Sequence, residues 1–121
     1  MSVFVKDASD QCYAFLNLKK GWDSCGAKPI KLTTIKNAVN FLNFIESYVF
    51  ETPHVIPLAE GGIQFEWVCD ERSLEINILE EERIIAYFNG NCEDDNAEID
   101  VQKDLKGLVK AFNIIRKCKH V

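Results

Sequence analysis

The fold is decided by residues 61–69, GGIQFEWVC, and by the shorter run LEINI at residues 74–78. In the first run large apolar side chains alternate with polar ones, and in the second leucine and isoleucine alternate with Glu75 and Asn77. Strict alternation of this kind is typical of β-strands with one buried face and one face in water. The two runs therefore predict neighbouring strands of an antiparallel sheet.

The same alternation restricts the connection between these strands. Inward residues are odd-numbered on the first strand and even-numbered on the second, so the numbers of paired residues must sum to an odd value. The loop must then contain an even number of residues. It is either the two residues Glu71 and Arg72 or the four residues 69–72.

The flanking segments extend the predicted sheet. Residues 54–56 lie between Pro53 and Pro57, which favours an edge strand because proline cannot donate to a central ladder. Residues 83–89 are apolar on both faces, which indicates a central or doubly covered strand. Residues 97–101 are expected to form a brief fifth strand.

Two helices are expected before the sheet. Residues 5–16 carry apolar side chains at helical spacing, and Lys19-Lys20-Gly21 is a suitable helix end because glycine adopts the left-handed cap conformation. Thr33 or Thr34 can cap a second helix, whose apolar stripe runs from Ile35 to Val49.

A third helix is expected to start at Val101, and Gly107 inside it should cost about 1 kcal/mol relative to alanine. The order of elements is helix, helix, a meander of four or five strands, and helix. This order predicts a single α+β domain over residues 1–121, with the helices packed on one face of an antiparallel sheet.

Composition narrows the class of protein. The 121 residues are 47% hydrophobic with a net charge of −5, as in an ordinary globular domain. No apolar run reaches the roughly 18 residues that a bilayer-spanning helix needs, so no membrane partner is expected. The five cysteines are odd in number and form no C-x-x-C pair, which favours reduced thiols and a cytoplasmic location.

Two motifs carry a resemblance to a known group. Residues 21–29, GWDSCGAKP, and residues 61–67, GGIQFEW, resemble small bacterial proteins of uncharacterised function that share a G-W-D-x-x-G-A-x-P loop and a G-G-[IV]-x-[LF]-E-W strand. The resemblance covers residues 10 to 90 and implies relatedness. It implies no activity, and the acidic loop and basic last helix lie outside its pattern.

Charge is distributed unevenly along the chain. Residues 46–100 hold 15 anions against two cations, whereas residues 1–45 and 101–121 have net charges of +3 and +5. One interpretation is a solvated surface that keeps sheet edges from pairing. The basic stripe of the last helix is explained by solubility, by the helix dipole or by pairing with the acidic sheet.

The other interpretation is a negative field that recognises a basic protein and disfavours direct contact with nucleic acid. The sequence therefore predicts a non-enzymatic binding module, of the kind found in antitoxins, immunity proteins and phage-borne inhibitors. Its partner-binding residues are expected to be Glu66, Glu75, Glu80, Glu81, Glu82, Glu93, Asp94 and Asp95.

Two alternatives remain open. One is a ligand-binding or catalytic pocket between the Trp22-Asp23 loop and the strand bearing Glu66 and Trp67, although a loop Trp and Asp more often pack and cap. The other is a self-associating subunit that uses an aromatic edge of the second helix, formed by Phe41, Phe44 and Tyr48.

No catalytic residue, cofactor or metal site is assigned. The chain lacks the phosphate-binding and dinucleotide-binding motifs, and its acidic loop lacks the spacing of a calcium loop. A thiol enzyme would need Cys25 beside His54, the one plausible nucleophile and base. The chain is therefore not expected to be an enzyme.

Overall fold

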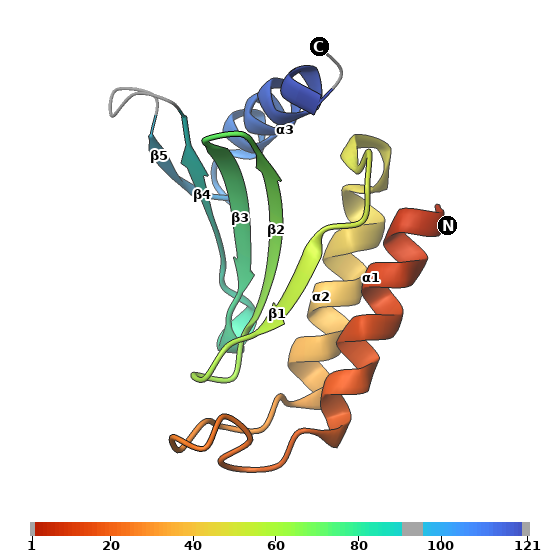
Figure 1. Ribbon diagram of the computed structural model, residues 1–121, viewed down its shortest axis with the longest axis vertical. Coiled ribbons are helices and arrows are strands. Elements are labelled where there is room, and N and C mark those ends of the chain that lie inside the picture. Colours follow the sequence, from red (N-terminus) through yellow and green to blue (C-terminus); the bar gives the residue numbers. More distant parts are fainter. Residues whose placement is uncertain (1, 91–95, 120–121) are drawn as a thin grey trace.

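The computed structural model describes residues 2–90 and 96–119 (Figure 1). These residues form an α+β fold, as predicted, with two helices before an antiparallel sheet and one after it. The helices are α1 (Val3–Ala14), α2 (Leu32–Phe44) and α3 (Leu105–Lys119), and the strands are β1 (His54–Pro57), β2 (Ile63–Cys69), β3 (Arg72–Ile78), β4 (Ile84–Asn89) and β5 (Ala97–Asp100). Short 3₁₀ turns are η1 (Phe15–Asn17), η2 (Glu46–Tyr48) and η3 (Glu80–Glu82).

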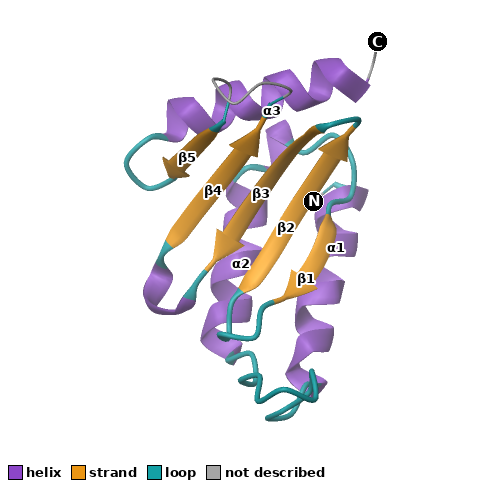
Figure 2. Cartoon of the chain, turned by 60° about the vertical axis from the view of Figure 1, so that its left-hand side comes forward, coloured by secondary structure: helices purple, strands orange, loops and turns teal. Residues whose placement is uncertain are grey.

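The sheet is a five-stranded meander. Its order is β1-β2-β3-β4-β5, and each strand is antiparallel to the next. The proline-flanked β1 is an edge strand and β4 is an inner strand, as expected. The three helices lie on one side of the sheet, behind it in Figure 2, so the sheet has a covered inner face and an open outer face.

The turn between β2 and β3 has an even number of residues, as predicted, but it lies at a different position. Cys69 pairs with Arg72, so the two loop residues are Asp70 and Glu71. The expected two-residue loop was Glu71 and Arg72, one position later. Asp70 adopts a φ of 54°. This left-handed conformation suits aspartate better than most residues, and it places the turn before Arg72.

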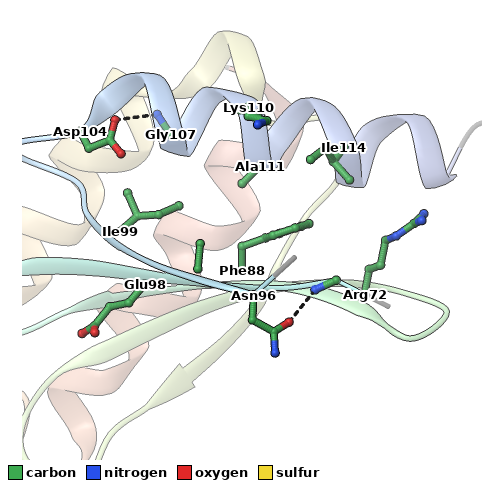
Figure 3. A pocket seen from close by; sticks show the side chains of 12 residues that line it. Arg72, Phe88, Asn96, Glu98, Ile99, Asp104, Gly107, Lys110, Ala111 and Ile114 are labelled. Atoms are coloured by element: carbon green, nitrogen blue, oxygen red, sulfur yellow. Dashed lines mark hydrogen bonds between the residues drawn. The ribbon is translucent and has the colours of Figure 1, made fainter. Parts of the chain in front are cut away.

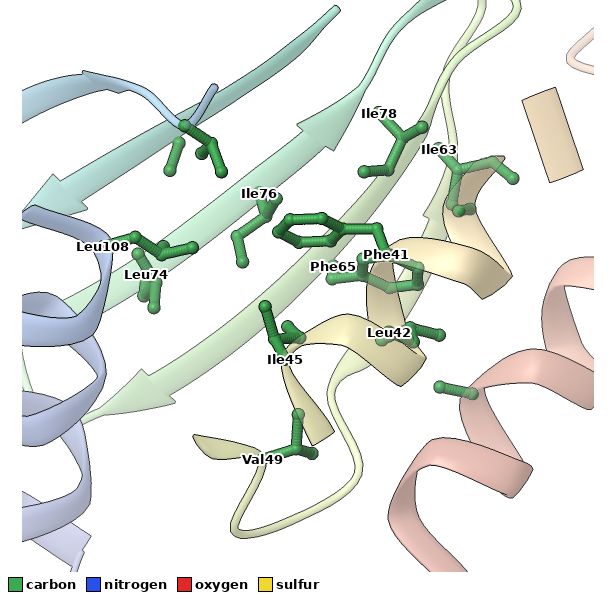
Figure 4. Packing of buried hydrophobic residues seen from close by; sticks show 14 of the residues in the cluster. Phe41, Leu42, Ile45, Val49, Ile63, Phe65, Leu74, Ile76, Ile78 and Leu108 are labelled. Atoms are coloured by element: carbon green, nitrogen blue, oxygen red, sulfur yellow. The ribbon is translucent and has the colours of Figure 1, made fainter. Parts of the chain in front are cut away.

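The core lies between the inner face and the helices (Figure 4). Phe65 and Trp67 of β2 are fully buried, as is Phe112 of α3. The rings of Trp67 and Phe112 meet edge to face with centroids 5.0 Å apart. The Trp67 indole also donates to the Glu51 carbonyl at 3.1 Å, so its polar atom is satisfied inside the core.

The first two helices have different limits from those expected. Regular helix ends at Ala14 and η1 ends at Asn17, because Leu18 takes an extended conformation. Gly21 is then free to serve the following loop, where its N–H donates to the Ala27 carbonyl at 2.7 Å. The second helix begins at Leu32 without a threonine cap.

The last helix also starts later than expected. Val101 is buried in a turn, and α3 begins after Asp104, whose carboxylate accepts a hydrogen bond from the Gly107 N–H at 2.9 Å. A Cβ on Gly107 would lie 2.5 Å from that carboxylate. The glycine thus belongs to a helix cap, and the expected cost of a mid-helix glycine does not apply.

The expectation that all cysteines are reduced is wrong. Cys69 and Cys118 form a disulfide, while Cys12 is free and buried and Cys25 is free and exposed. Cys92 lies outside the described residues. The two bonded residues are 49 positions apart, and only the packing of α3 on the sheet brings them together.

Within the described residues, no helix is long and apolar enough to cross a membrane. The cytoplasmic location stays a prediction. The disulfide bears on it, since such bonds persist mainly in oxidising compartments.

Candidate functional site

The outer face of the sheet carries the candidate site. Alternation along β2 and β3 directs Glu66 and Glu75 outward while their neighbours enter the core. Because the three helices occupy the other side, no described helix covers this face (Figure 2). Most side chains at its outward positions reach solvent, whereas Ile85 is buried.

One line of paired residues crosses all five strands of this face. His54 pairs with Glu66, Glu66 with Glu75, Glu75 with Tyr87, and Tyr87 with Glu98. We call these five residues the acidic row. Side chains that are directly opposite on neighbouring strands have Cβ atoms about 4.5–5.5 Å apart, so neighbours in the row are close enough to interact.

The acidic row brings like charges together. Glu66 and Glu75 are directly opposite each other, and the pKa of Glu75 is raised, first by burial and then by the charge of Glu66. Opposed like charges destabilise a sheet. None of the outward positions of the five strands holds lysine or arginine; Arg72 begins β3 with an inward position, and Arg83 precedes β4.

A second line of residues runs beside the acidic row and is less charged. Its members are Ile56, Gln64, Asn77, Ile85 and Asp100. Asp100 is 3.9 Å from the Lys103 ammonium, so its charge is partly balanced within the chain. The outer face thus combines carboxylates with amide and apolar groups, and Tyr87 in the acidic row is 37% exposed.

The three glutamates of η3 do not belong to this face. The Glu80 carboxylate folds over Gly61 and forms ion pairs with Lys31 at 3.2 Å and Lys28 at 3.9 Å. Its expected projection toward a partner is therefore wrong, because its charge is used to join two loops. Glu81 and Glu82 are exposed, but they border a hollow beside α2.

The remaining predicted partner-binding residues, Glu93, Asp94 and Asp95, lie outside the described residues. Of the eight acidic residues expected to act together, the structure places Glu66 and Glu75 side by side. Glu98 completes the row. It was not among the predicted site residues, because its alignment with Tyr87 depends on the register of the short β5.

The structure separates two residues of the alternative pocket near the Trp22-Asp23 loop. Glu66 and Trp67 are consecutive residues of β2 and therefore point to opposite faces of the sheet, with Trp67 buried on the inner face. Asp23 accepts hydrogen bonds from the N–H groups of Cys25 at 2.8 Å and Ala27 at 3.0 Å, which lower its pKa.

The loop around Asp23 is a structural unit. The Trp22 indole donates to the Lys28 carbonyl at 2.7 Å, and Lys28 N–H donates to Ala59 at 2.9 Å. The first bond closes the loop on itself, and the second joins the loop to the connection between β1 and β2. The side chains of Trp22 and Asp23 thus serve backbone groups, which is the packing and capping role that such residues more often have.

The predicted aromatic edge of the second helix is mostly internal. Phe41 is buried, and Tyr48 stacks on Phe112 with ring centroids 6.3 Å apart. Phe44 is 60% exposed. The edge expected to support self-association is thus reduced to one exposed ring.

The helix α3 and the acidic row lie on different sides of the sheet. The helix packs on the inner side, behind the strands in Figure 2, whereas Glu66 and Glu75 take outward positions. Arg116 turns toward the carbonyls of Tyr48 at 3.1 Å and Ser47 at 3.4 Å. Among the side chains that the structure describes, no basic residue of α3 forms an ion pair with the acidic row.

A cavity of about 540 Å³ lies between α3 and the strands β4 and β5 (Figure 3). Phe88 points into it from the sheet, and Ala111 and Ile114 point into it from the helix. Two of its polar groups already have internal partners, since Asp104 caps α3 and Asn96 accepts from Gly90 N–H at 3.0 Å. Among the described residues that line this cavity, no ion pair joins an acidic side chain to a basic one.

Comparison with known proteins gives no match for this chain among protein-family models, curated proteins or solved structures. The resemblance of residues 21–29 and 61–67 to a group of small bacterial proteins therefore stays a prediction. Functional arguments for this chain come from its own geometry.

Proposed function

We propose that this chain is a non-enzymatic binding module whose outer sheet face recognises a basic protein. The observation that carries the proposal is the acidic row, in which Glu66, Glu75 and Glu98 cross a face that no described helix covers. The outward strand positions of this face hold no lysine or arginine. Such a face attracts a partner of opposite charge and repels nucleic acid.

The opposed carboxylates explain why a cationic partner is favoured. Glu66 and Glu75 repel each other in the free protein, and a lysine or arginine placed between them would replace repulsion by attraction. Tyr87 sits between Glu75 and Glu98 in the same row and offers an aromatic surface with a polar tip. Aromatic groups of this kind are common anchors in protein interfaces, where charges at the rim control association rate.

Binding of this kind would inhibit a partner that itself binds nucleic acid. The basic groups of that partner would be occupied by carboxylates instead of phosphates. The proposed role is therefore recognition, and inhibition where the partner acts on nucleic acid.

Charge reversal at matched positions tests the proposal. The partner is first captured from a lysate of the source organism at low salt with the wild-type chain as bait, and is then purified. Association rates are measured for the double variant Glu66→Lys and Glu75→Lys, and for a control with the same change in net charge, Glu81→Lys and Glu82→Lys. We expect the first variant to associate at least about tenfold more slowly at low salt.

The control should change the association rate much less, and high salt should reduce the difference between the variants. Wild-type association by the variant reversed at Glu66 and Glu75 would refute the proposal. Equal slowing of both variants would also refute it, since net charge alone would then explain the effect.

A further inference from the structure

Three metal-ligating side chains meet where α3 crosses the end of the sheet. Cys69 ends β2, Asp70 opens the next turn, and Cys118 lies in the last turn of α3. Their ligand atoms all lie within 4.8 Å of one another. Each residue belongs to a hydrogen-bonded strand, a tight turn or a helix, so the backbone holds the three in place.

The position of Asp70 is not explained by the disulfide. One oxygen of its carboxylate is 3.9 Å from the Cys118 sulfur, and Asp70 forms no ion pair with any residue that the structure describes. A disulfide is uncharged and has no proton to donate, so it gains little from a neighbouring anion. A cation held by the two sulfurs would gain directly.

We propose that Cys69, Cys118 and Asp70 form a site for Zn²⁺ when the disulfide is reduced. Two thiolates and one carboxylate are ligands that zinc accepts, at about 2.3 Å from sulfur and about 2.0–2.2 Å from oxygen. A water molecule would complete the tetrahedron. Two Zn–S bonds at a tetrahedral angle place the sulfurs about 3.8 Å apart, which rotation about the Cα–Cβ bonds can supply.

The reaction sequence has two balanced steps. A dithiol reductant transfers two electrons and two protons to the disulfide, which gives two protein thiols and the oxidised reductant. Zn²⁺ then binds both sulfurs and displaces two protons into solvent, because the thiolate is the form that binds metal.

The site would have a mechanical consequence. Phe112 and Ile115 of α3 are fully buried, so the attachment of this helix matters for the core. The disulfide joins α3 to β2 in the oxidised chain, and the metal would join the same two elements in the reduced chain. The reduced chain without metal would have the weakest attachment.

Metal titration of the reduced protein tests this inference independently of the proposed partner. The full chain is reduced with a phosphine, which competes weakly for zinc, and titrated with ZnCl₂ against a chromophoric chelator. Co²⁺ serves as a spectroscopic probe, because thiolate ligands give it charge-transfer absorption. We expect one equivalent of Zn²⁺ to bind, and the melting temperature of the reduced chain to rise with zinc.

Matched variants assign the ligands. Cys69→Ser should abolish the thiolate-to-cobalt absorption typical of two sulfurs, and Asp70→Asn should weaken zinc binding by about tenfold or more. The controls are Cys25→Ser, which removes an exposed thiol elsewhere, and Glu71→Gln, which alters the other carboxylate of the same turn. Circular dichroism of each reduced variant confirms that it is folded.

Three results would overturn the site. They are no zinc binding by the folded reduced wild type, equal loss of affinity in either control, and unchanged zinc affinity in Asp70→Asn. Zinc binding that is lost or weakened only by Cys69→Ser and Asp70→Asn supports the site.

Discussion

The inner and outer faces of the sheet are built from alternate residues of the same strands, yet they obey different constraints. On β2, Phe65 and Trp67 are buried under helices, while Glu66 between them faces away. Residues of the inner face are selected by the burial of apolar surface. Because the core is closely packed, few other side chains fit at these positions. On the outer face Glu66 and Glu75 are only half-buried and Tyr87 is exposed, so packing restricts these side chains less.

This difference separates stability from recognition. A carboxylate pair such as Glu66 and Glu75 contributes repulsion to the folded state, so folding alone does not favour it. The inner face supplies enough stability for the outer face to carry such a pair. Substitutions on the two faces should therefore have effects of different size, and these differences can be measured.

The largest effect is expected for neighbouring residues of β2. Phe65→Ala should lower the free energy of unfolding by about 3–5 kcal/mol, because it opens a cavity in the core. Glu66→Ala should change it by about 0.5 kcal/mol or less. Urea denaturation of both variants measures the difference, and similar losses would show that the outer face is also packed.

A smaller effect is expected where α3 is fastened to the inner face. Cys118→Ser removes the disulfide, and closing a loop of this length contributes typically about 2–4 kcal/mol. The variant should lose that much stability relative to the oxidised wild type in buffer containing a chelator. Cys25→Ser is the control and should unfold like the wild type; an equal loss in both would exclude the disulfide as the cause.

The smallest effect is expected on the outer face itself. The pKa of Glu75 is raised above its ordinary 4.5, so the folded chain binds this proton more tightly than the unfolded chain. Its contribution to stability is complete below that ordinary value and is lost as pH rises through the raised pKa. Glu75→Gln should therefore stabilise the protein at neutral pH, by roughly 0.2–1 kcal/mol.

The control for this last prediction is Glu98→Gln, because Glu98 faces Tyr87 instead of another carboxylate. Unfolding curves measured between pH 4 and pH 7 should converge for wild type and Glu75→Gln at the acidic end. Curves that stay parallel throughout would contradict the role of carboxylate repulsion.

The sequence predicted the inner face well and the site only in part. Alternation in residues 63–69 and 74–78 determines which side chains enter the core, and parity alone determines that the connecting turn is even. The position of the turn depends on the left-handed conformation of Asp70, which the alternation of apolar and polar residues does not predict. The helix ends were also mispredicted, because Leu18 is extended and packs against the core, and Asp104 caps α3 by accepting from the Gly107 N–H.

The contacts that join distant segments could not be predicted from one sequence. Cys69 and Cys118 are far apart in the chain, and their meeting follows from where α3 crosses the sheet. From its place in an acidic run, Glu80 is expected to be an exposed charge. In the structure it forms ion pairs with Lys28 and Lys31 of the loop before α2. Charge counting identified an acidic segment, whereas strand register decided which of its carboxylates act together.

The edges of the sheet have a consequence for how the molecule behaves when crowded. β1 and β5 are each four residues long, and β1 ends in Pro57, which has no backbone N–H to offer. Short edge strands offer few unpaired backbone groups to a strand of another copy, so fibre growth by strand addition is disfavoured. In concentrated solution the chains should therefore not add strands edge to edge, and the acidic row would stay accessible to a different protein.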